Sequence, residues 1–187
     1  MAKLVQRSDW DHKSREKCKS IHDVNGIQLE GDVAGTRDTT YKGHYFVRTD
    51  ASLRTREVVV ECTGGSRLHI FSDGEGTWTN RVSGDPLPSL QGCVDVDIGI
   101  TPATNTLPIK RLGLRKGQSR DTTVCYAPLP SQTGGEFLAQ RAEQRYPCIE
   151  EDRSYLYQGI FRGFQAVLEI DEVGLVIDYP ETFRRTM

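Results

Sequence analysis

Residues 92–114, GCVDVDIGITPATNTLPIKRLGL, begin with a strict alternation of apolar and polar side chains. In an extended chain, one face carries Val94, Val96, Ile98 and Ile100, and the other carries Cys93, Asp95, Asp97 and Gly99. The pair Thr101-Pro102 ends this predicted strand, and an extended apolar pattern is expected to resume over 107–114. Two carboxylates followed by a loop of hydroxyl and amide groups are more polar than a structural hairpin requires. What they face is therefore the central question for function.

Short alternating segments bounded by turn residues lie on both sides of this stretch. Strands are expected over 15–21, 27–33, 40–48, 57–62, 67–71 and 76–82 before it, and over 122–127, 155–161, 164–170 and 175–179 after it. Turn pairs such as Asn25-Gly26 and Asp73-Gly74 separate them at the spacing typical of sandwiches and barrels. The sequence predicts a mainly β protein in which a single curved antiparallel sheet forms a closed or nearly closed barrel that hides its edges.

One short helix is expected over 136–146. Pro147 ends this segment, and helical spacing relates Phe137, Leu138, Arg141, Ala142 and Arg145. Because its apolar stripe is thin, the helix is expected to lie across the outside of the sheet or to plug one end. No repeat, low-complexity tract or linker divides the chain, so a single domain over 1–187 is predicted.

Composition limits the class of partner. The chain of 187 residues has a formal net charge of −2 and a hydrophobic fraction of 36%, and its apolar runs are too short for a membrane span. The charge argues against nucleic acid or an anionic membrane surface as the main partner, and the short apolar runs argue against stable membrane insertion. The N-terminal segment MAKLVQRSDWDHKSREK lacks an apolar signal region, and a cytoplasmic protein is therefore expected. The oligomeric state is not specified.

Neither the cysteines nor the histidines are spaced for metal or redox chemistry. Reduced, mostly packed thiols are expected because no Cys-x-x-Cys pair occurs among Cys18, Cys62, Cys93, Cys125 and Cys148. The sequence contains no nucleophile elbow, phosphate loop or zinc signature. No cofactor and no metal site are predicted, and no catalytic residue is identified.

Three regions carry candidate ligand-binding groups. Asp95 and Asp97 are suited to contact a ligand or to act as acid and base, or they balance nearby cations at the surface. Asn105 lies in a loop whose polar groups serve either local capping or a ligand's hydroxyls. Asp50 and Arg56 form either an ion pair that pins a hairpin or part of an anion site. Aromatic residues pack the core or, in a curled sheet, line a ligand cavity. The predicted ligand-binding set is Asp50, Arg56, Trp78, Asp95, Asp97, Asn105, Arg111, Tyr157 and Tyr179.

Residues 92–97, GCVDVD, and 101–112, TPATNTLPIKRL, resemble the glycolipid-binding family, formerly a domain of unknown function. Other landmarks in the same order are Trp10, Asp50 with Thr55-Arg56, Asp73-Gly74-x-Gly76-x-Trp78 and Gly174-Leu175-Val176-x-Asp178-Tyr179-Pro180. The resemblance covers nearly the whole chain. It implies a β-rich fold similar to the barrels of bacterial lipoprotein carriers, and a role in binding a glycolipid or lipid. The chain carries Ala103 where the family usually has an aromatic residue, which leaves the ligand size open.

Three hypotheses follow. In the first, the curved sheet encloses an amphiphilic small molecule or glycolipid, with its head at Asp95, Asp97, Asn105 and Arg56 and with Trp78 as a stacking face. In the second, the protein is an enzyme that acts on a sugar or lipid head group with Asp95 and Asp97 as acid and base. In the third, it is a structural or interaction protein with a solid core. The strand face that the two carboxylates occupy separates these hypotheses, and alternation does not label the faces.

Overall fold

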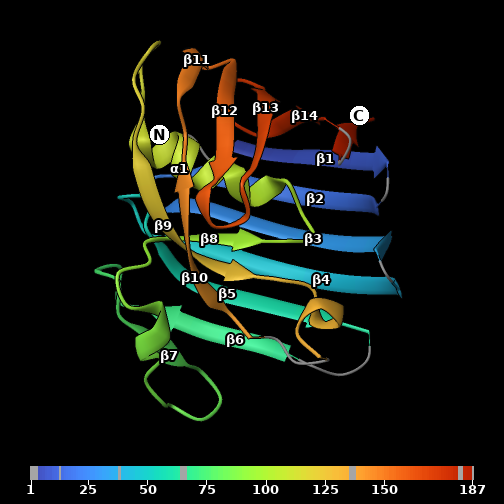
Figure 1. Cartoon of the computed structure of the whole chain (residues 1–187), viewed down its shortest axis with the longest axis vertical. Coiled ribbons are helices and arrows are strands. Elements are labelled where there is room, and N and C mark those ends of the chain that lie inside the picture. The colour runs from blue at the N-terminus through green and yellow to red at the C-terminus, as the bar shows by residue number, and fades with distance from the viewer. Residues whose placement is uncertain are drawn as a thin grey trace.

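The computed structural model describes residues 4–12, 14–37, 39–63, 67–134, 138–180 and 183–186, and strands make up most of it (Figure 1). The first half of the chain is an antiparallel meander in which each strand pairs with the next. Its strands are β1 (Leu4–His12), β2 (Ser14–Asp23), β3 (Gly26–Arg37), β4 (Thr39–Thr49), β5 (Thr55–Cys62), β6 (Arg67–Ser72) and β7 (Trp78–Asn80). Gly26 permits the tight turn between β2 and β3, since its φ is +128° and a Cβ there would lie 2.3 Å from the Asp50 carbonyl oxygen.

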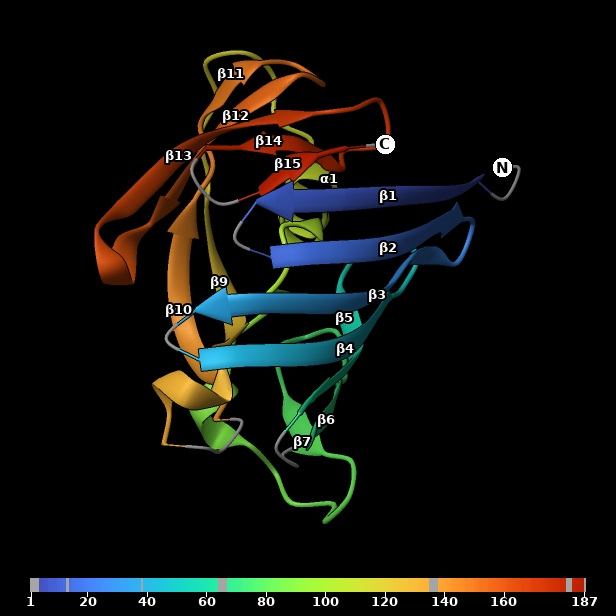
Figure 2. The ribbon, with the colours of Figure 1, turned by 90° about the vertical axis from the view of Figure 1, so that its right-hand side faces the viewer.

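The second half of the chain folds across the first (Figures 1 and 2). Its strands are β8 (Asp95–Ile98), β9 (Asp121–Ala127), β10 (Gln140–Arg145), β11 (Cys148–Glu150), β12 (Ser154–Gly159), β13 (Phe164–Ile170), β14 (Val176–Tyr179) and β15 (Phe183–Arg185). The helix α1 (Thr106–Leu112) and short 3-10 helices η1 (Pro88–Leu90), η2 (Ala103–Asn105), η3 (Pro130–Gln132) and η4 (Ile160–Arg162) lie between strands. Because β1 pairs with β15, the two halves form one curved sheet. The mainly β, curved-sheet prediction is confirmed.

The described strands do not close into a complete barrel. β7 and β8 are the two edge strands of the sheet, and within the described residues they do not pair with each other. Individual backbone hydrogen bonds draw the segment before β8 toward the opposite end of the sheet, from Thr55 N to Val94 O at 3.0 Å and from Gly92 N to Gly76 O at 2.9 Å. The sheet is therefore strongly curved, but its ends meet only through isolated bonds.

The prediction of a helix over 136–146 is wrong. Residues 140–145 form β10, paired with β9 and β12, while 135–137 lie outside the described residues. Ala142 and Gln144 are buried and alternate with exposed Arg141, Glu143 and Arg145, which is strand periodicity. Sheet pairing on both sides outweighs the helical propensity of Gln, Arg, Ala and Glu, because intrinsic propensity is a weak preference.

The one α-helix among the described residues instead occupies part of the stretch predicted to be extended. Residues 106–112 form α1, where Pro108 fits the first turn and Gly113 closes the end at φ +52°. This helix lies in the connection between β8 and β9, which pair in parallel rather than antiparallel. A parallel pair requires such a crossover. Residues 103–109 are all buried. They therefore lack the alternation of buried and exposed positions that distinguishes a helix from a strand.

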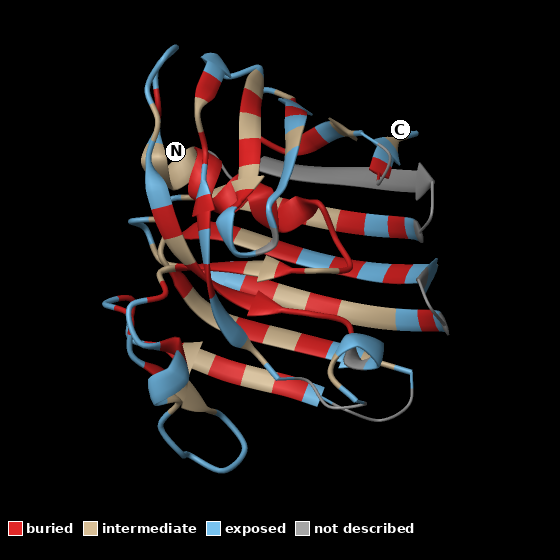
Figure 3. Ribbon diagram, viewed as in Figure 1, coloured by how far each residue is buried: buried red, intermediate tan, exposed pale blue. Residues whose placement is uncertain are grey.

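Side chains from both halves pack the interior. Alternating buried residues mark the inner faces of β2 to β6, visible as red bands in Figure 3. Tyr45, Trp78, Ile98, Ile100 and Leu107 are among the largest fully buried residues and belong to one core cluster. At the centre of the sheet, side chains of β8, η2 and α1 fill the space, so a ligand enclosed by the sheet has no room there. A cavity remains beside this core.

Candidate ligand-binding pocket

The cavity has a volume of about 340 Å³ and lies among strands of the second half and the segment that follows β8. Six of the thirteen residues that line it are aromatic and form its aromatic wall, and these are Tyr126, Tyr157, Phe161, Phe164, Tyr179 and Phe183. Polar side chains also reach it, namely Asp97, Thr101, Asn105 and Gln132. A concave, mainly apolar space with a few convergent polar groups is the usual form of a small-molecule site.

Four rings of the aromatic wall form a continuous set of contacts, and Tyr126 and Phe161 form a separate pair. Tyr157 lies 6.1 Å from both Phe164 and Tyr179 between ring centroids, and Tyr179 lies 6.4 Å from Phe183. Strand alternation positions Tyr157, since Tyr155, Tyr157 and Gly159 share the buried face of β12. The rings hold one another in place, which favours a preformed apolar surface.

A hydrogen-bonded network holds the polar groups of the pocket. Gln144 Nε2 donates to Asp97 Oδ2 at 2.6 Å and to Tyr157 Oη at 3.1 Å. Tyr146 Oη donates to Asn105 Oδ1 at 2.9 Å and approaches Gln144 Oε1 at 3.1 Å. Burial, and then the negative charge of Asp97, raises the pKa of both tyrosines far above the ordinary value. The phenols therefore remain neutral hydrogen-bonding groups.

A buried carboxyl group lies behind Thr101. Glu16 Oε1 accepts hydrogen bonds from Tyr45 Oη at 2.5 Å and from Thr101 Oγ1 at 2.7 Å. Burial raises the pKa of Glu16 to about 8, against the lowering effect of these two hydrogen bonds. Its Oε2 has no hydrogen-bond partner among the residues described. Glu16 therefore connects the meander to the loop that forms the pocket.

The family model described as "Putative glycolipid-binding" matches residues 7–185. The chain belongs to this glycolipid-binding family. A crystal structure of a DUF1089 family protein from Pseudomonas aeruginosa has the same fold, with a TM-score of 0.80 and 35% sequence identity over 94% of this chain and 93% of that one. No curated protein matches the sequence. The resemblance inferred from residues 92–97 and 101–112 is thus confirmed.

Four residues of the predicted ligand-binding set meet at the pocket of this family member, and these are Asp97, Asn105, Tyr157 and Tyr179. Gln144 and Tyr146, which orient them, were missed because their segment was interpreted as a helix. The signal for a strand was the alternation of charged Arg141, Glu143 and Arg145 with uncharged Ala142, Gln144 and Tyr146. Glu16 was missed because one acid within a charged strand carries no local mark of burial.

Asp95 and Arg111 form an internal ion pair and do not line the pocket. Arg111 Nε donates to Asp95 Oδ1 at 2.9 Å, and Nη2 donates to Oδ2 at 2.6 Å. Thr122 Oγ1 donates to the same Oδ2 at 2.7 Å. Asp95 is fully buried, and its hydrogen bonds raise the pKa of Arg111. This arrangement joins β8, α1 and β9 and does not provide the shared cleft that an Asp95–Asp97 acid–base pair requires.

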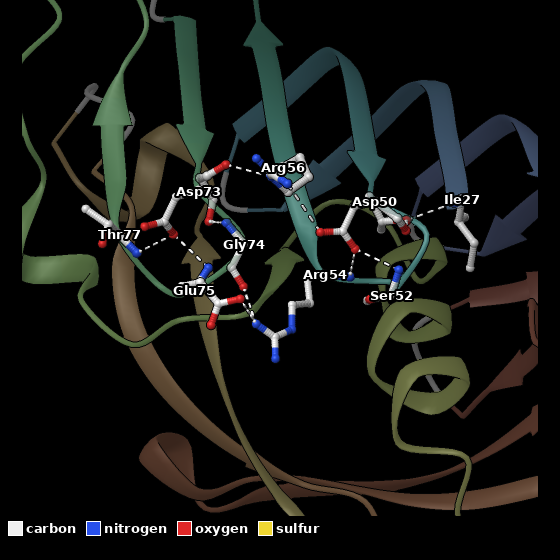
Figure 4. A network of polar contacts seen from close by, with 11 residues as sticks. Ile27, Asp50, Ser52, Arg54, Arg56, Asp73, Gly74, Glu75 and Thr77 are labelled. Carbon is white, nitrogen blue, oxygen red and sulfur yellow. Dashed lines mark hydrogen bonds and ion pairs between the residues drawn. The ribbon is translucent and has the colours of Figure 1, made fainter. Parts of the chain in front are cut away.

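Asp50 and Arg56 lie in a network of loops away from the pocket lining (Figure 4). Asp50 Oδ1 accepts from the backbone N–H groups of Ser52 at 2.9 Å and Arg54 at 3.1 Å. Arg56 Nη1 lies 3.4 Å from Asp50 Oδ2, and Arg56 Nε donates to Ser72 O at 2.9 Å. The pair fastens the β4–β5 loop to β6, which agrees with the hairpin-pinning alternative.

Trp78 is a core residue. Its indole is buried, and Nε1 donates to Cys93 O at 2.9 Å. This bond joins β7 to the segment before β8. Trp78 is not among the residues that line the pocket. Within the described residues, no group of three or more His, Cys, Asp or Glu side chains is arranged to hold a metal ion. No helix described is both long and apolar enough to cross a membrane.

Proposed function

We propose that the protein binds an amphiphile, with the apolar part of the ligand against the aromatic wall and a hydroxylated head group beside Asp97 and Asn105. The single observation that carries this proposal is the meeting of an aromatic wall and an organised polar set in one pocket of about 340 Å³. The family description supports the same class of ligand.

The aromatic wall supplies the apolar half of the site. Tyr157, Phe164 and Tyr179 contact one another through their rings and all line the pocket. Each methylene that moves from water onto such a surface contributes about 0.8 kcal/mol before ordering costs. A few methylenes next to the head group are therefore enough to distinguish an amphiphile from a free sugar.

The polar set supplies the recognition of the head. The Asp97 carboxylate is an acceptor for hydroxyl groups, and Gln144 holds one of its oxygens at 2.6 Å. Asn105 is positioned by Tyr146 and by its own bond to Pro102 O at 3.0 Å. Buried partners already hold these side chains in place in the folded protein. Ligand binding therefore costs little additional conformational entropy at these residues.

The volume of the pocket limits how much ligand it encloses. A cavity of about 340 Å³ is at the small end of the range of small-molecule sites, which starts near 300 Å³. We expect the site to enclose a head group and the first part of one chain, with the rest of the chain outside. The ligand is therefore recognised at its polar–apolar junction.

Binding of octyl glucoside, measured by titration calorimetry below its micelle concentration, tests the proposal. We expect octyl glucoside to bind and glucose alone to bind at least about tenfold more weakly, because glucose lacks the apolar part. Asp97→Asn and Phe164→Ala should each weaken octyl glucoside binding about tenfold. Glu143→Gln, which removes an exposed charge from β10, is the matched control and should bind like the wild type.

Absence of octyl glucoside binding by the wild type would remove the proposal. So would binding that neither Asp97→Asn nor Phe164→Ala changes, because the ligand would then occupy another place. Circular dichroism of each variant verifies that a loss of binding does not come from a loss of fold.

A further inference from the structure

The turn between β12 and β13 exposes an unusual concentration of large apolar side chains. We call residues 159–164, with the sequence GIFRGF, the β12–β13 tip. Ile160 is 46% exposed, Phe161 43% and Phe164 46%. Figure 2 shows this turn projecting from the body of the molecule at the left of the view. Gly163 shapes the turn, with a φ of +64° that favours glycine.

The exposed surface of the tip is continuous with the pocket. Phe161 and Phe164 are both half-exposed and both line the cavity. The Phe161 ring lies 5.3 Å from that of Tyr126 on β9, and the Phe164 ring lies 6.1 Å from that of Tyr179 on β14. The tip therefore spans the cavity between these two strands, and an apolar path leads from solvent to the aromatic wall.

We propose that the β12–β13 tip docks on a lipid bilayer, and that the amphiphile passes between bilayer and pocket along this path. The inference rests on the proposed function. Aromatic and aliphatic side chains on one turn insert reversibly into the boundary between head groups and acyl chains. The tip sequence GIFRGF has one basic and no acidic residue, so its local charge suits an anionic bilayer although the whole chain has a net charge of −2.

The size of the apolar surface favours a bilayer over a protein partner. A stable protein interface buries about 800 Å² on each partner, which far exceeds what three half-exposed side chains on a narrow turn offer. Shallow insertion of a few apolar side chains is enough for weak, reversible membrane binding. Such weak binding suits a protein that exchanges its ligand with a membrane.

Ile160→Asp tests the proposal, because Ile160 is exposed and does not line the pocket. Val82→Asp is the matched control, since Val82 is 80% exposed in the turn after β7, far from the tip along the sheet. The assay is co-sedimentation with vesicles of phosphatidylcholine containing phosphatidylglycerol, and with vesicles of phosphatidylcholine alone. Octyl glucoside affinity is measured in parallel as the readout of the pocket.

We expect the wild type and Val82→Asp to bind the mixed vesicles equally, and more tightly than neutral ones. Ile160→Asp should bind them about tenfold more weakly while keeping its octyl glucoside affinity. Equal vesicle binding by Ile160→Asp and the wild type overturns the docking role. So does a wild type that binds octyl glucoside but not vesicles, which leaves the proposed function standing. A wild type that binds neither removes both proposals, and an Ile160-dependent dimer without vesicle binding assigns the tip to self-association and overturns bilayer docking.

Discussion

Gln144 Nε2 lies 2.6 Å from Asp97 Oδ2, so a side chain from β10 holds a carboxylate of β8 across the intervening strand β9. The same amide nitrogen reaches Tyr157 Oη at 3.1 Å on β12. The buried side chain of Gln144 thus links the polar side of the pocket to its aromatic side. We therefore expect the geometry of the pocket to depend on this residue.

Gln144→Ala should lower both stability and ligand affinity. The substitution removes the hydrogen bonds to Asp97 and Tyr157, and we expect a loss of about 2 kcal/mol in the free energy of unfolding, measured by urea denaturation. Octyl glucoside affinity should fall about tenfold, because Asp97 is no longer oriented. Gln140→Ala, at an exposed position of the same strand, should change neither quantity. Unchanged affinity in Gln144→Ala would contradict the organising role.

Asp95 and Arg111 should affect stability and leave binding unchanged. Asp95→Asn or Arg111→Met breaks a buried ion pair, and each should cost about 3 kcal/mol in the free energy of unfolding. The double variant should lose less than the sum of the two, because neither partner then remains buried alone. Octyl glucoside affinity should stay within about twofold of the wild type in every variant that folds. A selective loss of affinity in Asp95→Asn would instead return Asp95 to the ligand site.

Glu16 should make stability fall as pH rises. Its pKa is raised by burial from 4.5 to about 8, so between these values the folded state retains a proton that the unfolded chain has lost. The stability that this proton provides is complete below pH 4.5 and is lost as pH rises through about 8. Glu16→Gln removes this dependence on pH. Its free energy of unfolding, measured by urea denaturation, should therefore rise relative to that of the wild type as pH increases from 4.5 to about 8. Parallel pH profiles for the two proteins would refute the assignment.

Trp78→Phe tests whether the indole stacks on ligand, as the sequence suggested. The change removes the hydrogen bond to Cys93 O and leaves a small cavity, so a loss of about 1–3 kcal/mol in the free energy of unfolding is expected. Octyl glucoside affinity should not change, because Trp78 does not line the pocket. A stable Trp78→Phe protein with weakened binding would favour the stacking role.

The sequence determined the β-rich class, most of the strands and the family. Alternation in segments such as 27–33 and 164–170 and turn pairs such as Asn25-Gly26 are local signals, and they confine the backbone with little help from distant residues. The family motif around Asp95 and Asp97 is equally local. These features could be interpreted without knowing which strands become neighbours.

Only the tertiary structure decided which polar groups serve the site. Alternation places Asp95 and Asp97 on the same face of β8, yet Arg111 of α1 binds the first carboxylate and Gln144 of β10 binds the second. Their partners lie 16 and 47 residues further along the chain. The pairing of β1 with β15 and the placement of β10 inside the sheet are also contacts between distant segments. Burial and partner identity arise from such contacts, and local spacing does not encode them.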